Sequence, residues 1–175
     1  VLFRDDSSVY VGTGSFITTN RWRAACVSGN LRVFSPEGTQ YDMTQSGNAP
    51  FGQQAWYTTK ITDRNGNSIT IGYANLTGTV VPSTISASDG RNVTFNYTGT
   101  AQNTILSSIT DGTRTWQYSY RAVTGYIGAW FLTAVTPPAG GAWQYTYDET
   151  NSGPPGKFCV KTVTQPQGGV ITYAY

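Results

Sequence analysis

The chain of 175 residues carries a net charge of +2, and charged residues make up only 11% of it. It contains no histidine, which excludes a Ser-His-Asp or Cys-His catalytic arrangement and histidine-ligated zinc within this chain. The 11 basic residues are scattered, so we expect no nucleic-acid-binding surface, and no apolar run is long enough to cross a bilayer.

The first residues predict short strands without a regular repeat. Residues 1–11 and 31–43 each consist of two apolar runs around a polar turn, which is the pattern of a β-hairpin. The second turn is Ser35-Pro36-Glu37-Gly38, with proline where a fixed φ helps and glycine where the chain reverses. Residues 16–26 predict one or two further strands, and residues 45–54, rich in Gly, Asn and Pro, predict a loop.

A hairpin motif then recurs five times. In its first copy a β-branched residue precedes a turn with glycine, after which apolar and polar residues alternate up to a closing tyrosine. This alternation places apolar side chains on one face of a strand and polar side chains on the other. The copies, spaced by 23 to 28 residues, are 61–73, 85–97, 109–120, 135–147 and 163–175. No segment has helical periodicity, so we predict an all-β fold with an N-terminal β-hairpin region (1–50) before five repeats (51–175).

The closing strands share one apolar face. The closing tyrosine and the residues two and four positions before it are apolar or aromatic in every copy, fifteen positions in all. Burial of one such side chain is worth about 1.5–3 kcal/mol, whereas a whole domain is stable by only about 5–15 kcal/mol. We therefore expect an array of antiparallel hairpins in a twisted sheet, which curls over its apolar face or packs against another part of the protein.

The repeat resembles that of the rearrangement-hotspot (RHS), or tyrosine–aspartate (YD), repeat family of large secreted and surface proteins. The resemblance is carried by glycine-containing turns, closing tyrosines and Tyr-Asp pairs in residues 35–42, 61–73, 89–97 and 147–148. It implies that each repeat is a β-hairpin and that many repeats form a hollow shell, which can enclose a toxic C-terminal domain. Related arrays are adhesion or carbohydrate-contacting modules.

From this resemblance we expect a segment of a longer, secreted or cell-surface bacterial protein, because the chain begins with Val1 and ends on the repeat-closing Tyr175. The segment would be a non-enzymatic part of a β-shell around a toxin or effector domain. Its partners would then be the remaining repeats or that domain. The alternative is an adhesion module that binds a surface glycan or a protein, and a hydrolase with paired carboxylates is a third reading.

One set of aromatic residues in the array leaves two interpretations open. Exposed rings on a sheet can stack on sugar rings or bind a partner protein. Buried rings at the same positions would form the core face, as Ile69 and Ile71 are expected to do. The residues are Trp116, Tyr118, Trp143, Tyr145 and Tyr173.

The other chemically active side chains predict no catalytic residue, no metal site and no cofactor. Most carboxylates fall in turns, among them Asp63, Asp89 and Asp111, where an aspartate caps backbone N–H groups. Cys26 and Cys159 are too few for a four-ligand zinc site. They either form one disulfide between the N-terminal region and the last hairpin, or they are two buried free thiols.

Overall fold

The computed structural model describes residues 9–10, 15–48, 54–76, 78–99, 104–149 and 158–175. Within these ranges every regular element is a β-strand and none is a helix, so the predicted all-β fold is confirmed. The strands are antiparallel and form one large sheet and one small ribbon. The chain divides into two compact units, unit 1 (Val1–Thr94) and unit 2 (Phe95–Tyr175).

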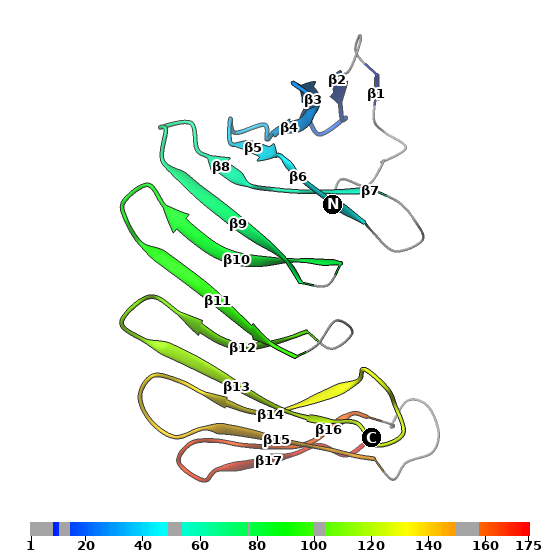
Figure 1. Cartoon of the computed structure of the whole chain (residues 1–175), viewed down its shortest axis with the longest axis vertical. Helices are drawn as coiled ribbons and strands as arrows, with labels where there is room; N and C mark the ends of the chain where they lie inside the picture. Colours follow the sequence, from blue (N-terminus) through cyan, green and yellow to red (C-terminus); the bar gives the residue numbers. More distant parts are fainter. Residues whose placement is uncertain (1–8, 11–14, 49–53, 77, 100–103, 150–157) are drawn as a thin grey trace. The chain divides into compact units, whose positions relative to one another are not determined.

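Unit 1 contains the strands β1 to β10 and the first part of β11 (Figure 1). Their bounds are β1 (Val9–Tyr10), β2 (Ser15–Ile17), β3 (Arg23–Val27), β4 (Asn30–Phe34), β5 (Gln40–Met43), β6 (Gln45–Asn48), β7 (Gln54–Tyr57), β8 (Lys60–Thr62), β9 (Ser68–Leu76), β10 (Thr79–Ala87) and β11 (Asn92–Thr98). In the sheet they follow the order β1-β2-β3-β4-β5-β8-β9-β10-β11, with β6 and β7 paired separately. The strands predicted over 16–26 and the hairpin predicted over 31–43 are confirmed, whereas most of the hairpin predicted over 1–11 lies outside the described residues.

The loop predicted over 45–54 is wrong in its first part, because β6 is a strand. Gly47 pairs with Ala55 of β7, and Asn48 pairs with Gln54, while residues 49–53 lie outside the described ranges. Glycine and asparagine usually favour turns, but Gly47 and Asn48 belong to an extended two-stranded ribbon.

This ribbon packs on the apolar face of unit 1. The Tyr57 ring lies 5.5 Å from the ring of Tyr73, measured between centroids. A Cβ atom on Gly47 would lie only 2.8 Å from Cγ2 of Val80, so the backbone of β6 approaches β10 as closely as glycine permits. The glycine is therefore a packing residue, and the ribbon covers part of a face that would otherwise meet water.

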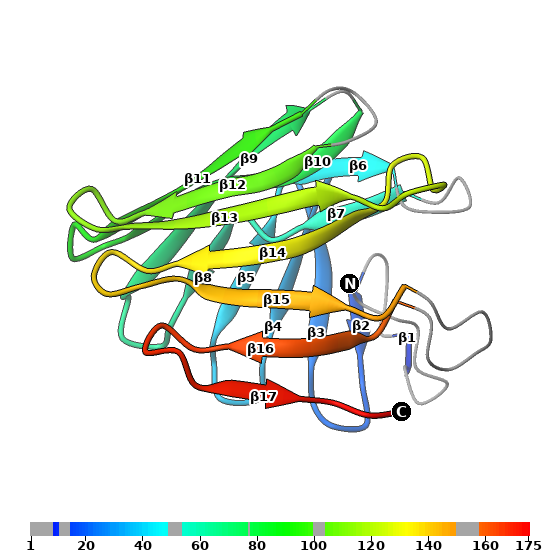
Figure 2. The same ribbon diagram turned by 90° about the horizontal axis from the view of Figure 1, so that it is seen from below.

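Unit 2 contains the rest of β11 and six further strands, which lie side by side in chain order (Figure 2). They are β12 (Ile105–Thr110), β13 (Thr115–Ala122), β14 (Trp130–Thr136), β15 (Trp143–Tyr147), β16 (Val160–Thr164) and β17 (Val170–Thr172). The hairpins β12–β13, β14–β15 and β16–β17 have short turns, and these turns lie at one end of the unit 2 strands.

Four of the hairpin turns share one five-residue geometry, whereas the turn at Asp111 closes over four residues, with the Asp111 N–H donating to the Arg114 carbonyl. In the turn from Asp63 to Asn67, the Gly66 N–H donates to the Asp63 carbonyl (3.1 Å) and the Asp63 N–H to the Asn67 carbonyl (2.9 Å). Gly66 has a φ of 90°, a value that disfavours any side chain. The same pair of hydrogen bonds closes the turns 35–39, 87–91 and 165–169.

The hairpins also share one register. In each of them the β-branched residue before the turn lies opposite the apolar residue four positions before the closing tyrosine. The pairs are Ile61–Ile69, Ile85–Val93, Ile109–Trp116, Val135–Trp143 and Val163–Ile171. Val33 and Tyr41 form the same kind of pair around the turn 35–39, so this upstream hairpin has the geometry of a repeat although it has no closing tyrosine.

Three of the closing tyrosines, Tyr73, Tyr147 and Tyr175, bond back to a backbone carbonyl that precedes the turn of their own hairpin. The Tyr147 hydroxyl donates to the Leu132 carbonyl (2.9 Å), and the Tyr175 hydroxyl to the Val160 carbonyl (3.1 Å). Tyr73 does the same with the carbonyl of Thr58 (2.8 Å), again across fifteen residues. Burial raises the pKa of Tyr73, Tyr97, Tyr120 and Tyr147. The tyrosine is therefore required for its hydroxyl as well as for its ring.

Three of the closing tyrosines lie opposite a β-bulge in the first strand of the next hairpin. Tyr147 lies opposite Val160, and the register shifts between Thr146 and Tyr147. Val160 in turn accepts the hydroxyl hydrogen bond of Tyr175, the next closing tyrosine. Bulges at Tyr73 and Tyr120 repeat this arrangement. The tyrosine positions thus join successive hairpins through a local twist in the sheet.

The apolar face is covered only in part. Among the described residues the buried hydrophobic side chains are Val33, Met43, Val123 and Phe131, and none belongs to the fifteen positions of the repeat. Five of the fifteen are exposed, namely Ile69, Trp143, Ile171, Tyr173 and Tyr175. The other ten are partly buried, so the expectation that this face is hidden from water is met only in part.

Candidate interaction surface

The aromatic residues selected from the sequence come together on one face of unit 2, which we call the aromatic face. Trp116 and Tyr118 lie on β13, Trp143 and Tyr145 on β15, and Tyr173 follows β17 directly. Residues two apart in a strand point to the same side. On the intervening strands β14 and β16, β-branched side chains lie opposite the aromatic ones. The same face therefore extends across these neighbouring strands.

Two rows of cross-strand neighbours build the aromatic face. In one row Val135 lies between Tyr118 and Trp143. In the other, Val163 lies between Tyr145 and Ile171. Pairs of aromatic and β-branched side chains each contribute about 0.2–1 kcal/mol to a sheet. These rows therefore stabilise unit 2 even where water reaches them.

The five aromatic residues differ in exposure. Trp116, Tyr118 and Tyr145 are partly buried, while Trp143 is 36% exposed and Tyr173 is 45% exposed. Tyr173 follows a strand that has a neighbour on one side only in the sheet order. The aromatic face is therefore neither a closed core nor a fully open platform, and Trp143 and Tyr173 are its two accessible rings.

A compact cluster of rings closes the opposite end of the unit 2 strands from the turns. Phe131 is 5% exposed and stacks on Tyr147, with ring centroids 4.2 Å apart. The Arg121 guanidinium lies 4.7 Å from the centroid of the Phe131 ring and forms an ion pair with Glu149. Phe158, whose φ is 69°, packs against the same ring at 5.7 Å. Phe131 is recognisable from the sequence as an apolar strand residue, but no local pattern shows that it lies at the centre of this cluster.

The loop after β13 carries an exposed apolar tip. Tyr126 is half exposed and makes an edge-on contact with Phe158 at 5.0 Å, whereas Ile127 is 100% exposed. Backbone hydrogen bonds from Val123 to Ala129 and from Tyr126 to Val123 hold the loop. Backbone hydrogen bonds therefore hold the base of the loop, while the side chain of Ile127 at its tip lies in solvent.

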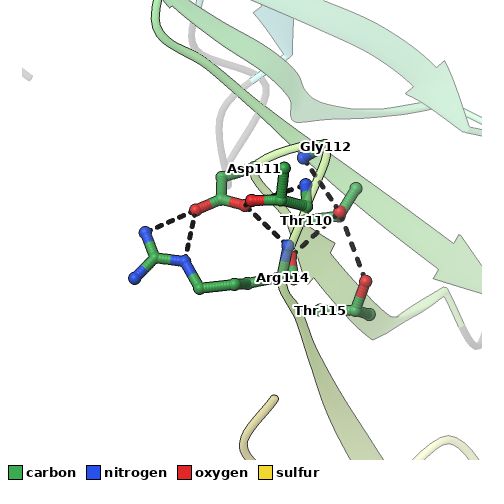
Figure 3. Close-up of polar contacts among 6 residues, drawn as sticks. Thr110, Asp111, Gly112, Arg114 and Thr115 are labelled. Carbon is green, nitrogen blue, oxygen red and sulfur yellow. Dashed lines mark hydrogen bonds and ion pairs between the residues drawn. The ribbon is translucent and has the colours of Figure 1, made fainter.

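The turn carboxylates serve the turns, as the sequence predicts. Asp111 accepts hydrogen bonds from the backbone N–H groups of Thr113 and Arg114, and the Arg114 side chain pairs with it at 2.6 Å (Figure 3). The backbone hydrogen bond and the guanidinium of Arg114 strongly lower the pKa of Asp111. A hydrogen bond from the Asn67 side chain lowers the pKa of Asp63. These groups are ionised and hydrogen-bonded at neutral pH, which is unsuited to a general acid.

The described part of the chain contains no group of three or more Cys, Asp or Glu side chains that could hold a metal ion. Its helix-free structure also offers no helical membrane span in those residues. Neither Cys26 nor Cys159 is in a disulfide in the structure. Cys26 is exposed and Cys159 partly buried, so the pair of buried thiols considered from the sequence is not what the structure shows.

No family model matches the chain, and no curated protein matches it either. The RHS/YD-repeat resemblance therefore stays a prediction that rests on the residues themselves.

Proposed function

We propose that this chain is a wall segment of a secreted or cell-surface RHS/YD-repeat protein, in which the hairpin array forms part of a shell around a toxin or effector domain. The observation that carries the proposal is the repeated tyrosine hydrogen bond. Tyr73, Tyr147 and Tyr175 each bond to a carbonyl fifteen residues earlier, at the same place in three hairpins. The same hydrogen bond in several hairpins supports the view that the hairpin is a structural repeat that stacks in tandem with further copies.

The chemistry of the two faces also supports a wall. One face carries the apolar repeat positions, and the row Thr146, Thr162 and Thr172 on the other face has uncharged hydroxyls in neighbouring strands. A partly covered apolar face suits contact with another protein surface. In this proposal the chain itself catalyses no reaction, and the aromatic face contacts the enclosed domain or further repeats.

The full-length product of the gene that encodes this chain provides the test. If the array belongs to a closed shell, the effector segment of that product should resist protease in the intact protein and be cleaved when expressed alone. Cleavage at the same rate in both forms would contradict the shell. Electron microscopy of the same preparation should show a hollow particle around the protected segment.

A second function, binding of a surface glycan, is favoured by the accessible rings of Trp143 and Tyr173. Aromatic rings bind sugars by stacking on their apolar faces. Neutral oligosaccharides should then quench tryptophan fluorescence in the wild-type chain and fail to do so in Trp143→Ala. An unchanged spectrum with a panel of neutral glycans would leave the wall as the better proposal.

A further inference from the structure

Asn65 is followed by Gly66 in the turn of the β8–β9 hairpin, and the sequence has no other Asn-Gly pair. Both residues are exposed. A Cβ atom built on Gly66 would meet no atom within 4 Å, so the space beside its backbone is open. Because glycine has no side chain, its backbone nitrogen is accessible to the side chain of the residue before it. The pair therefore suits an attack of a backbone nitrogen on a side-chain amide.

The side chain of Asn65 is not held by its surroundings. Its amide forms no hydrogen bond with a described residue, although its backbone N–H donates to Oδ1 of Asp63 (2.8 Å). Asn67 differs, because its Nδ2 donates to Oδ2 of Asp63 (2.8 Å) and a serine follows it instead of a glycine. Of the two asparagines in this turn, Asn65 is the one that can rotate toward the next backbone nitrogen without breaking a side-chain hydrogen bond.

One backbone hydrogen bond must open before the Gly66 nitrogen can react. The Gly66 N–H donates to the Asp63 carbonyl at 3.1 Å. The bond lies in an exposed turn, where water can replace either partner. Local opening of such a turn costs much less than unfolding of the whole unit. The hydrogen bond therefore slows the reaction but does not prevent it.

Two other turns with the same geometry have a longer side chain at the position of Asn65. Glu37 precedes the glycine of the turn 35–39, and Gln167 precedes that of the turn 165–169. An attack of the glycine nitrogen on either side chain would have to close a ring that is one atom larger and forms more slowly. These turns are therefore protected by side-chain length.

Two further turns have an aspartate before glycine, and their carboxylates are occupied. Asp89 accepts a hydrogen bond from Arg91 Nε (2.8 Å), and Asp111 accepts one from Arg114 Nε (2.8 Å; Figure 3). These hydrogen bonds lower the pKa of both aspartates. A carboxylate ion is a poor target for a nucleophile, because attack would add to its negative charge. The arginines therefore protect these two turns.

We propose that Asn65 is a site of spontaneous deamidation. The Gly66 nitrogen loses its proton to hydroxide and bonds to Cγ of Asn65. The bond between Cγ and Nδ2 then breaks, and the amide group takes a proton from water and leaves as ammonia. Water opens the cyclic imide at one of its two carbonyls, which gives aspartate or isoaspartate at position 65. The inference does not depend on the wall function.

Isoaspartate opens the end of the hairpin. Its main chain runs through the former side chain, which adds one carbon atom to a turn closed by the hydrogen bond from the Asp63 N–H to the Asn67 carbonyl (2.9 Å). Both products also place a negative charge beside the Asp63 carboxylate, whose Oδ1 accepts the N–H of residue 65. The Ile61–Ile69 pair next to the turn therefore loses its support.

Incubation of the whole chain at mildly alkaline pH provides the test, followed by peptide mapping with electron-transfer fragmentation, which distinguishes aspartate from isoaspartate. Modification should be at least about tenfold faster at Asn65 than at Asn67, where a side-chain hydrogen bond must also break. The rate should rise with pH, because the Gly66 nitrogen reacts without its proton. Asn65→Gln is the matched variant, since Gln167 has the same place in the turn 165–169, and it should stay unmodified at position 65.

Hydrogen exchange of the same samples measures the consequence. The incubated wild-type chain should exchange at least about tenfold faster in β8 and β9, because the turn hydrogen bonds are lost, with no change in β13 to β16. Incubated Asn65→Gln should exchange as its fresh sample does. An intact Asn65 after incubation, or equally fast modification of Asn67 or Asp89, would overturn the assignment of the site. Unchanged exchange in molecules that carry isoaspartate would overturn the opening of the hairpin.

Discussion

The two units use the same hairpin but cover its apolar face by different means. In unit 1 the face is largely aliphatic, and a separate ribbon packs on it through Gly47 and Tyr57. In unit 2 the face is rich in tryptophan and tyrosine, and a cluster centred on Phe131 covers only the strand ends away from the turns. Aromatic side chains bury much area against their neighbours while a polar atom stays near water, so they tolerate partial exposure better than aliphatic ones. The apolar face of the repeat can therefore be covered by a separate segment, or it can stay partly exposed where its residues are aromatic.

The largest expected effect is the loss of the ring cluster in unit 2. Phe131→Ala should destabilise unit 2 by about 3–5 kcal/mol, because a buried ring is replaced by a cavity. Hydrogen exchange followed by mass spectrometry should show faster exchange in β13 to β16 and unchanged exchange in β3 to β5. Trp143→Ala removes an exposed ring and is the control, with a much smaller effect. Equal effects of the two variants would contradict the assignment of Phe131 as the core of unit 2.

A change at Gly47 should break the cover of unit 1. Gly47→Val forces a side chain into Val80, where even a Cβ atom is too close, and should cost about 1–3 kcal/mol. Hydrogen exchange in β6, β7 and β10 should rise, while β13 to β16 keep their protection. Ser46→Ala, on the same strand, should leave exchange unchanged. An unaffected ribbon in Gly47→Val would mean that it does not pack closely on the sheet.

The tyrosine hydroxyls should contribute less, and to different extents. Tyr147→Phe keeps the ring on Phe131 but leaves the Leu132 carbonyl without its donor, at a cost of about 0.5–1.5 kcal/mol. Tyr175→Phe should cost less, because Tyr175 is exposed and water can replace the lost partner. Urea denaturation of both variants measures the difference. A larger effect for Tyr175→Phe would contradict the role of burial.

The smallest effect should come from acid. Asp63, Asp89 and Asp111 have a pKa below the ordinary 3.8 in the folded state, chiefly because of hydrogen bonds from Asn67, Arg91 and Arg114, respectively. A lowered folded pKa gives stability that is present above the unfolded pKa and is lost as the pH falls through the folded value, so the loss should begin below about pH 4.

Carboxyl-detected NMR titration measures these pKa values in both units. Asp111 should titrate at the lowest pH, and Asp111→Asn should remove its part of the acid dependence. All three groups lie in exposed turns, so the change in stability should be small. Midpoints at or above 3.8 would contradict the hydrogen bonding of these turns.

Local sequence patterns determined much of this fold. Alternation up to Tyr73 and the glycine of the turn were enough to place the hairpins, because strand periodicity and turn chemistry act over a few residues. The sequence does not mark the upstream hairpin at Val33 as a repeat, because Gln45 stands where the other hairpins have tyrosine. Its turn hydrogen bonds, which are what the repeat shares, depend on backbone geometry that many sequences adopt.

The covering of the apolar face and the placement of charges on the polar face could not be predicted. The ribbon on unit 1 depends on the close approach of Gly47 to Val80, two residues whose contact no local pattern shows. Arg32, Asp42 and Lys60 form a row only because three strands pair in one particular register. A shift of one residue would move them to the opposite face. The aromatic positions were found, but their exposure depends on what lies above the sheet.

The direction of the tyrosine hydrogen bonds bears on how the chain is made. Tyr73, Tyr147 and Tyr175 all reach back to a carbonyl that precedes them, never forward. During synthesis the acceptor has therefore already emerged from the ribosome when its donor appears, and the interval of fifteen residues keeps the search short. Each of these hairpins can therefore form its tyrosine hydrogen bond as soon as it emerges, so the array can fold hairpin by hairpin from its N-terminal end.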